Sequence, residues 1–373
     1  MKKHFNYFLF FLVAALVSFG FLFLVCLSST SSLKRFGNTD YYWLHQLAGL
    51  GLAIGFGFLG YKIPISFFKK WALPAVLVNL LALFLVFIPQ LGGALGGASR
   101  WFHVGGFTIQ PSEFLKITSI LYLSAWIASK LSETRASDFK SFAQKSWHNL
   151  IYIFIPFAVF LGMIFIGLYL QSDASTLGIT TITLLALYFS SKTPLWHTLV
   201  IVITGIGTLL LMVISEPYRL ERWLTFLHPD TDPLGKGLQI RQSLISLGSG
   251  GIFGKGLGMS TIKGQLPMAM SDSIFAIFGE ELGIVGCLVL IGAFLFLLYL
   301  GIKIAKESND KFSRMVATGI VVWITLQAFI NMASAAGIFP LAGIPLPFFS
   351  YGGSHLAVEI FSIGLLLNIA KNT

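Results

Sequence analysis

The chain has 373 residues, of which 55% are hydrophobic and only 11% charged, and its formal net charge is +10. Soluble domains have about 45–50% apolar and about 25% charged residues, so this composition excludes a water-soluble enzyme. The basic residues lie in short clusters between apolar runs, which is typical of a polytopic membrane protein and argues against a nucleic-acid partner. Both cysteines, Cys26 and Cys287, fall inside apolar runs, so the sequence predicts no disulfide framework.

Ten apolar stretches are long enough to cross the bilayer as helices, which takes about 20 residues. They lie near residues 6–27, 43–61, 71–90, 110–129, 149–170, 174–191, 195–216, 272–302, 313–337 and 354–370. The first is too long for a signal peptide and lacks a small-residue cleavage site, so we interpret it as a retained anchor. The predicted fold is an all-α polytopic membrane protein of about ten transmembrane helices, forming one transmembrane domain over residues 1–373.

The distribution of Lys and Arg predicts the orientation of these helices. With the N-terminus in the cytoplasm, 15 of the 25 basic residues lie on the cytoplasmic side, as the positive-inside rule requires. Both termini are then cytoplasmic, and one long extracytoplasmic loop, residues 217–271, joins the seventh and eighth helices. A loop of that length is where function concentrates. The segment 130–148 is expected to be a solvated cytoplasmic connector.

A few charged residues lie in or beside the predicted spans, where each costs about 2.5–3.5 kcal/mol at the bilayer centre unless it has a partner. They are Glu113, Lys116, Asp173, Asp272, Glu280, Glu281 and Glu359. Most of them gather near the predicted outer surface. The exception is Glu359, for which the sequence indicates no role.

Glu113 and Lys116 open the fourth span, after Pro111. Proline suits a first helical turn, and a carboxylate there can cap the free amides. Residues three apart share one helix face, so both side chains point into the bundle. Two interpretations of Glu113 fit equally well: a structural cap in an ion pair, and a catalytic acid. Lys116 lies at the wrong end of the helix dipole for a cation, which indicates an anionic partner.

Asp272 immediately precedes the eighth span, where the long loop re-enters the membrane. It could cap that helix. The alternative is a carboxylate at the outer mouth of the bundle, facing Lys116 and able to act as a base.

Two irregular segments flank this region. The glycine run 248–258 does not fit the nucleotide P-loop spacing, and it is either plain turn structure or a loop whose backbone approaches a lipid-linked diphosphate. The segment 345–354 contains two prolines and two glycines, so it must be extended or re-entrant and should line the outer cavity. His45, His103, His197 and His355 show no metal-ligand spacing.

Taken together, these segments closely resemble the SEDS family, the polytopic glycan polymerases of bacterial cell-wall synthesis that include FtsW and RodA. The carrying segments are Gly97-Ala98-Ser99-Arg100-Trp101-Phe102, Gln110-Pro111-Ser112-Glu113-Phe114-Leu115-Lys116, Asp230-Thr231-Asp232-Pro233-Leu234-Gly235, Gln242-Ser243-Leu244-Ile245-Ser246-Leu247, Asp272 with Gly279-Glu280-Glu281-Leu282-Gly283, and Pro347-Phe348-Phe349-Ser350-Tyr351-Gly352-Gly353-Ser354. The turn at Gly256-Leu257-Gly258 and the junction at Asp272-Ser273-Ile274 look more like FtsW than RodA.

The resemblance implies a multi-pass protein of the bacterial cytoplasmic (inner) membrane that polymerises lipid II, an undecaprenyl-pyrophosphate-linked disaccharide-pentapeptide, at the outer face. It places the family's essential aspartate on Asp272, the buried acid and lysine on Glu113 and Lys116, and another functional position on Arg100. It also implies a class B penicillin-binding protein as partner, with other division or elongation proteins of the membrane. A division role is expected, and an elongation role of the RodA type is the alternative.

The sequence also departs from the common family pattern. Met268-Ala269-Met270-Ser271 stands before Asp272 where many members have a Glu and a His, so those side chains cannot be essential here. Ser172 replaces a proline before Asp173, and His355 replaces the second of two serines.

The expected chemistry needs a base for the sugar hydroxyl and cations for the departing diphosphate. We assign the base to Asp272, with Lys116 holding it in place and Glu113 beside it. The candidate substrate-binding residues are Arg100, Arg219, Arg222, Arg241, Ser350, Gly352 and Gly353. A divalent cation, Mg²⁺ or Mn²⁺, could share the work, with Asp272 as its tentative ligand, and no organic cofactor is expected. The competing interpretations are a lipid II flippase and a non-catalytic scaffold.

Overall fold

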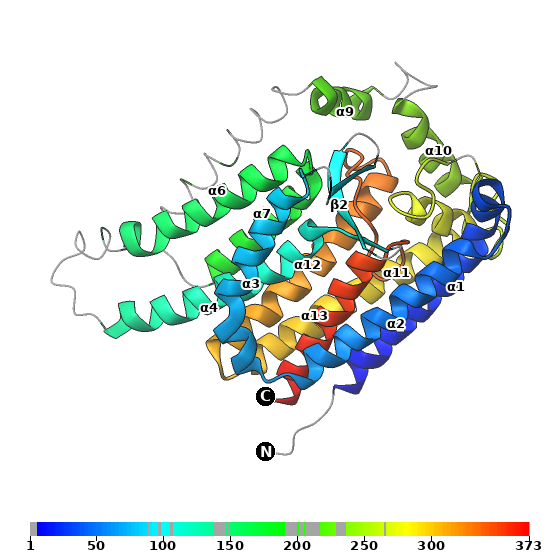
Figure 1. Ribbon diagram of the computed structural model, residues 1–373. Helices are drawn as coiled ribbons and strands as arrows, with labels where there is room; N and C mark the ends of the chain where they lie inside the picture. The colour runs from blue at the N-terminus through cyan, green and yellow to red at the C-terminus, as the bar shows by residue number, and fades with distance from the viewer. Residues whose placement is uncertain are drawn as a thin grey trace.

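The computed structural model describes residues 6–88, 90, 92–95, 98–104, 107–136, 147, 149–190, 200, 205, 207, 217–228, 236–264 and 266–372. Its helices form an elongated bundle (Figure 1). They are α1 (Tyr7–Phe36), α2 (Tyr41–Lys62), α3 (Ile65–Leu85), α4 (Pro111–Ala136), the π-helix η1 (Leu150–Phe154), α6 (Ile155–Leu170), α7 (Ala174–Ser190), α9 (Pro217–Leu227), α10 (Lys236–Ser249), α11 (Ile274–Glu307), α12 (Lys311–Ala335) and α13 (Gly353–Lys371).

Nine of the ten predicted spans coincide with helices in the described part of the chain. Seven described helices are long and apolar enough to cross a membrane, and α7 is a shorter apolar helix. All but three residues of the predicted span 195–216, and residues 137–146 of the predicted connector 130–148, lie outside the described part of the chain. The chain is therefore an all-α polytopic membrane protein, as the hydropathy pattern predicted.

A small antiparallel sheet, which the sequence did not predict, joins α3 to α4. Its strands are β1 (Gly92–Leu95), β2 (Ala98–Val104) and β3 (Phe107–Ile109), in the order β1-β2-β3. Phe102 pairs with Ile109, so the sheet delivers the chain directly to the start of α4 at Pro111. The strands are short, and a hairpin of this size gains its stability from packing against helices.

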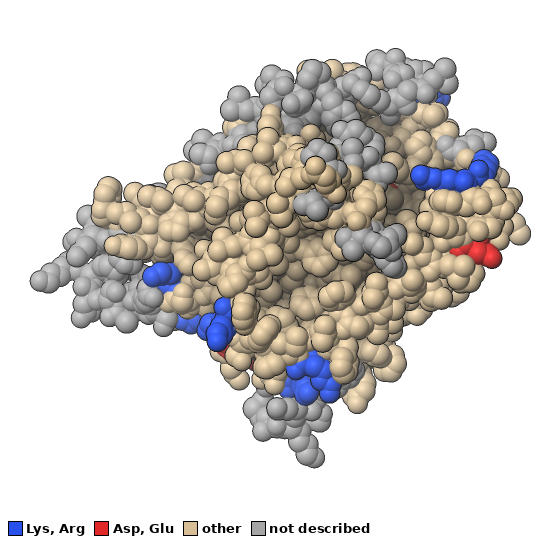
Figure 2. Space-filling model, in the orientation of Figure 1, with Lys and Arg blue, Asp and Glu red and all other residues tan. Residues whose placement is uncertain are grey.

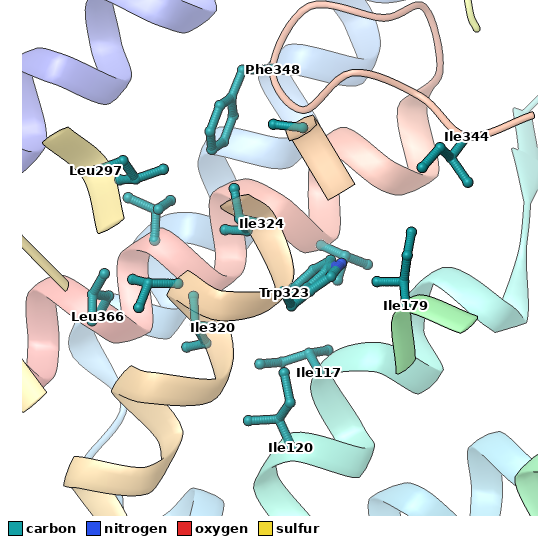
Figure 3. Close-up of a cluster of buried hydrophobic side chains, with 14 of the residues drawn as sticks. Ile117, Ile120, Ile179, Leu297, Ile320, Trp323, Ile324, Ile344, Phe348 and Leu366 are labelled. Carbon is teal, nitrogen blue, oxygen red and sulfur yellow. The ribbon is translucent and has the colours of Figure 1, made fainter. Parts of the chain in front are cut away.

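The centre of the bundle is formed by α12 and α13. In each of them 72% of the most apolar stretch is buried, against 22–33% in the other candidate spans. Side chains of α4, α7, α11, α12 and α13 interdigitate around Trp323, Ile320 and Ile324 (Figure 3). Helices with so much buried surface can carry polar groups that lipid would not tolerate.

Small residues allow α2 and α13 to pack closely. A Cβ added at Gly60 would lie 2.6 Å from the Phe361 carbonyl oxygen, and one at Gly364 would lie 2.0 Å from the Gly57 carbonyl oxygen. Transmembrane helices associate through such contacts because lipid provides no hydrophobic driving force between them.

The outer surface of the bundle is apolar where lipid would cover it. Leu77, Leu81, Leu288 and Val289 are all more than half exposed. A broad band of the face shown in Figure 2 has no charged side chain, and Lys and Arg lie in patches along its lower edge and again at the upper right. At the lower end α1 begins and α13 ends, whereas β2, α9 and α10 lie toward the opposite end (Figure 1).

Candidate functional site

Asp272 lies where the chain passes from the long loop into α11. The Ser271 hydroxyl donates to its Oδ1 at 2.5 Å. A Cβ built on Gly343 would lie 3.6 Å from Asp272 Oδ2 and 3.9 Å from Arg222 Nη2, so the carboxylate and the guanidinium both reach this glycine. The N-cap residue of α11 is Ser273, and it makes no side-chain cap hydrogen bond. This arrangement favours the interpretation of Asp272 as a functional carboxylate over that of a helix cap.

The electrostatic surroundings of Asp272 are mixed. Burial raises the pKa of this carboxyl above its usual value, and the Ser271 hydroxyl and the positive charge of Arg222 act in the opposite direction. Arg222 belongs to α9 and is itself positioned by a hydrogen bond of 3.3 Å from its Nη1 to the Leu341 carbonyl. The positive charge that lowers the pKa of Asp272 therefore comes from the long loop.

The backbone around Asp272 is fixed by two other elements. Asn331 of α12 donates to the Asp272 carbonyl at 3.0 Å and to the Ile344 carbonyl at 2.7 Å. The Ser350 hydroxyl donates to the Ser271 carbonyl at 2.7 Å, and the Tyr351 amide donates to the Met270 carbonyl at 2.8 Å. Of the predicted irregular segment 345–354, residues 345–352 are irregular and 353–354 open α13. The irregular part packs on protein and holds the backbone just before Asp272.

Glu113 and Lys116 form the predicted buried pair near the start of α4, with 2.8 Å between Lys116 Nζ and Glu113 Oε2. Lys116 also donates to Gln327 Oε1 at 2.8 Å and lies 4.9 Å from the centre of the Trp323 ring. The predicted contact between Lys116 and Asp272 is wrong, since no salt bridge joins these two described residues. Lys116 is held by Glu113, Gln327 and Trp323, and the cation whose charge acts on Asp272 is Arg222, without a direct salt bridge between these two described side chains.

The other predicted arginines differ in their placement. Arg100 of β2 donates through Nε to the Gln171 carbonyl at 2.8 Å and through Nη2 to the Ser172 carbonyl at 2.6 Å. These two hydrogen bonds tie its guanidinium to the turn between α6 and α7. Arg241 of α10 is exposed. The side chain of Arg219 lies outside the described part of the structure.

Asp173, which follows that turn, has a structural role. Its Oδ1 accepts from the Thr176 amide at 3.2 Å, capping α7, and its Oδ2 accepts from the Ser112 hydroxyl at 3.1 Å. It therefore ties the start of α7 to the start of α4.

The glycine run 248–258 folds onto α11 as turn structure. Glu280 Oε1 accepts from Lys255 Nζ at 2.7 Å, and Glu281 Oε2 accepts from the Gly258 amide at 2.8 Å. At the contact, α11 is interrupted by Gly283, whose φ is 68°, and a Cβ there would lie 2.4 Å from the Gly254 nitrogen. Because protein carboxylates occupy these donors, the structure favours the turn interpretation over a diphosphate cradle.

The remaining predicted substrate-binding residues lie at the start of α13. The Ser350 hydroxyl is only 1% exposed and also accepts from the Leu346 amide at 2.8 Å. The Gly352 amide donates to Gln46 Oε1 at 3.0 Å, and Gly353 is the first residue of α13. His355, the family departure, has its Nε2 3.1 Å from the Ser350 carbonyl oxygen.

A divalent cation would find one carboxylate here. Among the described residues no three His, Cys, Asp or Glu side chains come together as a metal cluster. Mg²⁺ is nevertheless often held by one or two carboxylates together with substrate phosphates. Asp272 fits that mode.

Three polar residues near Asp272 and Lys116 were not among the predicted site residues. Gln327 and Asn331 lie inside the apolar ninth span, and Ser271 precedes the predicted base. A fully buried Gln327 beside Trp323 in α12 is the kind of intramembrane polar group that signals a partner, and that signal was available from the sequence.

Comparison with known proteins identifies relatives along the whole chain. The family model FtsW/RodA/SpoVE, described as "Cell cycle protein", matches residues 7–373. A probable peptidoglycan glycosyltransferase FtsW of Trichlorobacter lovleyi is 38% identical over 96% of this chain and 91% of the relative. The FtsW of Coxiella burnetii with the same description is 35% identical over 96% and 94%. Stage V sporulation protein E of Bacillus subtilis is 32% identical over 95% and 94%.

Solved structures agree in fold. One chain, from a structure titled "Structural coordination of polymerization and crosslinking by a peptidoglycan synthase complex", matches with a TM-score of 0.77 and 25% identity over 99% of this chain and 98% of that one. The rod shape determining protein RodA of Thermus thermophilus matches with a TM-score of 0.70 and 24% identity over 99% and 97%. The chain therefore belongs to the FtsW/RodA/SpoVE family, known as SEDS.

Proposed function

We propose that this protein is a peptidoglycan glycosyltransferase of the FtsW type, which polymerises lipid II for septal wall synthesis at the outer face of the bacterial cytoplasmic membrane. Full-length relatives at 35–38% identity are described as FtsW glycosyltransferases. The observation that carries the mechanism is the Asp272 carboxylate where the long loop meets α11: the Ser271 hydroxyl donates to it, and the charge of Arg222 acts on it from the other side of Gly343.

In the proposed reaction, Asp272 is the general base. The sugar 4-hydroxyl of one lipid-linked substrate attacks the anomeric carbon of a second one. The new C–O bond forms, and the bond from that carbon to the lipid pyrophosphate breaks. The hydroxyl proton passes to Asp272 as the hydroxyl becomes acidic in the transition state. Attack from the face opposite the leaving group inverts the anomeric centre, so an α-linked donor gives a β-linked glycan.

The departing diphosphate needs positive charge. Arg222 is the cation already placed beside Asp272, and its planar guanidinium matches phosphate oxygens. Arg241, Arg219 and Arg100 are further candidates. Asp272 is the residue that would hold a divalent cation, which would supply Lewis-acid stabilisation of the leaving group. Lys116 and Glu113 act from deeper in the bundle, as a positioning pair.

The proposal also fixes orientation and partner. Both termini lie in the cytoplasm and loop 217–271 lies outside, in keeping with the placement of α9 and α10 at the end of the bundle opposite the start of α1 (Figure 1). Catalysis occurs in a complex with a class B penicillin-binding protein whose transpeptidase crosslinks the new strands, as expected from the structural match to a chain of a peptidoglycan synthase complex.

The decisive experiment measures polymerisation of labelled lipid II by purified protein, with and without the cognate penicillin-binding protein. Asp272→Ala and Asp272→Asn should abolish polymer, since neither side chain can accept the proton. Asp310→Asn, a matched change at the N-cap of α12, should leave polymer unchanged because Asn is also a good cap. Polymer at the wild-type rate from Asp272→Asn would refute the base. Lipid II crossing vesicle bilayers without any polymerisation would favour the flippase.

A further inference from the structure

Glu359 is a buried carboxylate for which the proposed reaction gives no role. It lies in the middle of α13 with 0% of its surface exposed. Its Oε2 accepts from the Phe348 amide at 2.9 Å, and its Oε1 accepts from Gln327 Nε2 at 3.5 Å. A carboxylate at such depth needs compensating donors, and these two come from elements that lead to different parts of the candidate site.

The first contact fixes an unusual backbone. Phe348 has a φ of 66°, a left-handed conformation that bulky residues other than glycine rarely adopt. Its ring is buried and stacks on Phe294, with 6.5 Å between the ring centres. Glu359 supplies the hydrogen-bond acceptor for the amide that this conformation turns inward. Such outliers persist only where the surroundings over-determine them.

The segment shaped in this way supports Asp272. Two residues after Phe348, the Ser350 hydroxyl bonds to the Ser271 carbonyl at 2.7 Å. The next residue, Tyr351, donates its amide to the Met270 carbonyl at 2.8 Å. The position of the base therefore depends on the path of the chain through Phe348.

The second contact reaches Lys116. Gln327 Oε1 accepts from Lys116 Nζ at 2.8 Å and from Trp323 Nε1 at 2.9 Å. Its Nε2 donates to the Pro345 carbonyl at 3.1 Å as well as to Glu359. Two donors on one side of the carboxamide and two acceptors on the other leave only one orientation of Gln327 that satisfies all of them.

We propose that Glu359 is a positioning residue that aligns both halves of the site at once, the Asp272 turn through Phe348 and the Lys116 ammonium through Gln327. This inference rests on the proposed polymerase function. Glu359 touches no reacting atom. It sets the geometry from within α13, and misplacement of catalytic groups by about 1 Å can lower a rate by about a hundredfold.

Three variants separate the contact with Phe348 from the contact with Gln327. Glu359→Gln keeps an oxygen for the Phe348 amide but presents an NH₂ group to Gln327 Nε2, so two donors face each other. Flipping Gln327 relieves that clash only by turning its NH₂ toward Lys116 and Trp323. Glu359→Met fills a similar volume and loses both contacts. The swapped pair Gln327→Glu with Glu359→Gln restores a donor–acceptor match between the two side chains while still accepting from Lys116.

The experiment measures steady-state polymerisation together with hydrogen–deuterium exchange of the segments 345–351 and 268–273 in nanodiscs. Glu359→Met should lower kcat by at least about tenfold with little change in KM and should speed exchange in both segments. Glu359→Gln should lower kcat without speeding exchange, and the swapped pair should recover part of that loss. Ser362→Ala is the matched control: Ser362 is equally buried in α13 but bonds only within its helix, to the Val358 carbonyl at 2.7 Å, and should behave as wild type.

The proposal is overturned if folded Glu359→Met keeps the wild-type kcat, or if exchange in the two segments does not change. Failure of the swapped pair to exceed Glu359→Gln would remove the Gln327 branch. If the wild type itself makes no polymer, the proposed function fails, yet the exchange measurement still tests whether Glu359 holds the Asp272 turn.

Discussion

At the scale of the residue, the site is defined by which cation each carboxylate meets. The charge of Arg222, from the long loop, acts on Asp272, whereas Glu113 forms a salt bridge with Lys116 within its own helix. The cation that influences the proposed base therefore comes from the loop, and Lys116 belongs to a separate ion pair. That separation makes the ionisation of Asp272 open to test through Arg222 alone.

The pH dependence of polymerisation should report this pairing. Only ionised Asp272 can accept a proton, and burial raises its pKa, so activity should fall on acidification at a higher pH than an ordinary aspartate would give. Removing the charge of Arg222 takes away an influence that lowers the pKa. The acidic limb of kcat/KM in Arg222→Gln should therefore move to still higher pH.

Arg222→Lys is the matched variant, because it keeps the charge while losing the planar fork. Its acidic limb should stay closer to that of the wild type, whatever happens to the plateau rate. An acidic limb in Arg222→Gln that is unmoved, or displaced to lower pH, would contradict the assignment of Arg222 as the partner of Asp272.

At the scale of the element, the first turns of α11 form the surface on which the glycine run packs. Its buried Glu280 accepts from Lys255, and from the hydroxyls of Ser260 and Thr261 at 2.6 and 2.9 Å. The kink at Gly283 lets the backbones approach. The turn that leads from α10 toward Asp272 is therefore built on α11.

Glu280→Ala should lower the free energy of unfolding by about 1–3 kcal/mol, because the buried Ser260 hydroxyl loses its acceptor, whereas the Lys255 side chain is one-third exposed and can be hydrated. Unfolding in detergent and hydrogen exchange over 250–261 would measure the loss. The control is Glu307→Ala on the same helix. Glu307 and Lys303 are 4.0 Å apart and more than half exposed, and exposed pairs contribute about 0–1 kcal/mol. Equal effects of the two substitutions would show that Glu280 does not anchor the glycine run to α11.

At the scale of the whole molecule, the bundle is arranged around α12 and α13, the two most buried spans. Their interior position lets α12 carry Gln327 and Asn331 and lets α13 carry Glu359, all within 1% of full burial. Their hydrogen bonds connect α4, the turn before α11 and the segment before α13. The peripheral spans, by contrast, offer lipid an apolar surface.

Labelling from outside the cell should establish the proposed orientation. In a background with Cys26 and Cys287 replaced by alanine, Phe253→Cys places a thiol at a position 81% exposed in the glycine run. It should react with an impermeant maleimide in intact spheroplasts. Asn309→Cys, exposed between α11 and α12, should react only after permeabilisation. The reverse pattern would invert the topology.

Local chemistry explains why much of the fold followed from the sequence. Hydropathy located the spans, Pro111 marked the start of α4, and the Glu113–Lys116 spacing predicted that both side chains share one face and point into the bundle, where the structure shows them buried and ion-paired. The prolines and glycines of 345–354 correctly indicated a break before α13. Each of these inferences depends on interactions within a few residues or on transfer between water and lipid.

The sequence by itself determined which residues must avoid lipid, since charge and hydropathy are properties of the side chain. Tertiary structure alone decided which groups these residues lie near: it placed the charge of Arg222 near Asp272, Gln327 against Lys116, and the Phe348 amide against Glu359. Helical periodicity predicts which residues share a face of a helix, but it does not predict which helix packs against that face. The neighbour depends on how α4, α12 and α13 pack, and that is settled by close contacts between segments far apart in the chain.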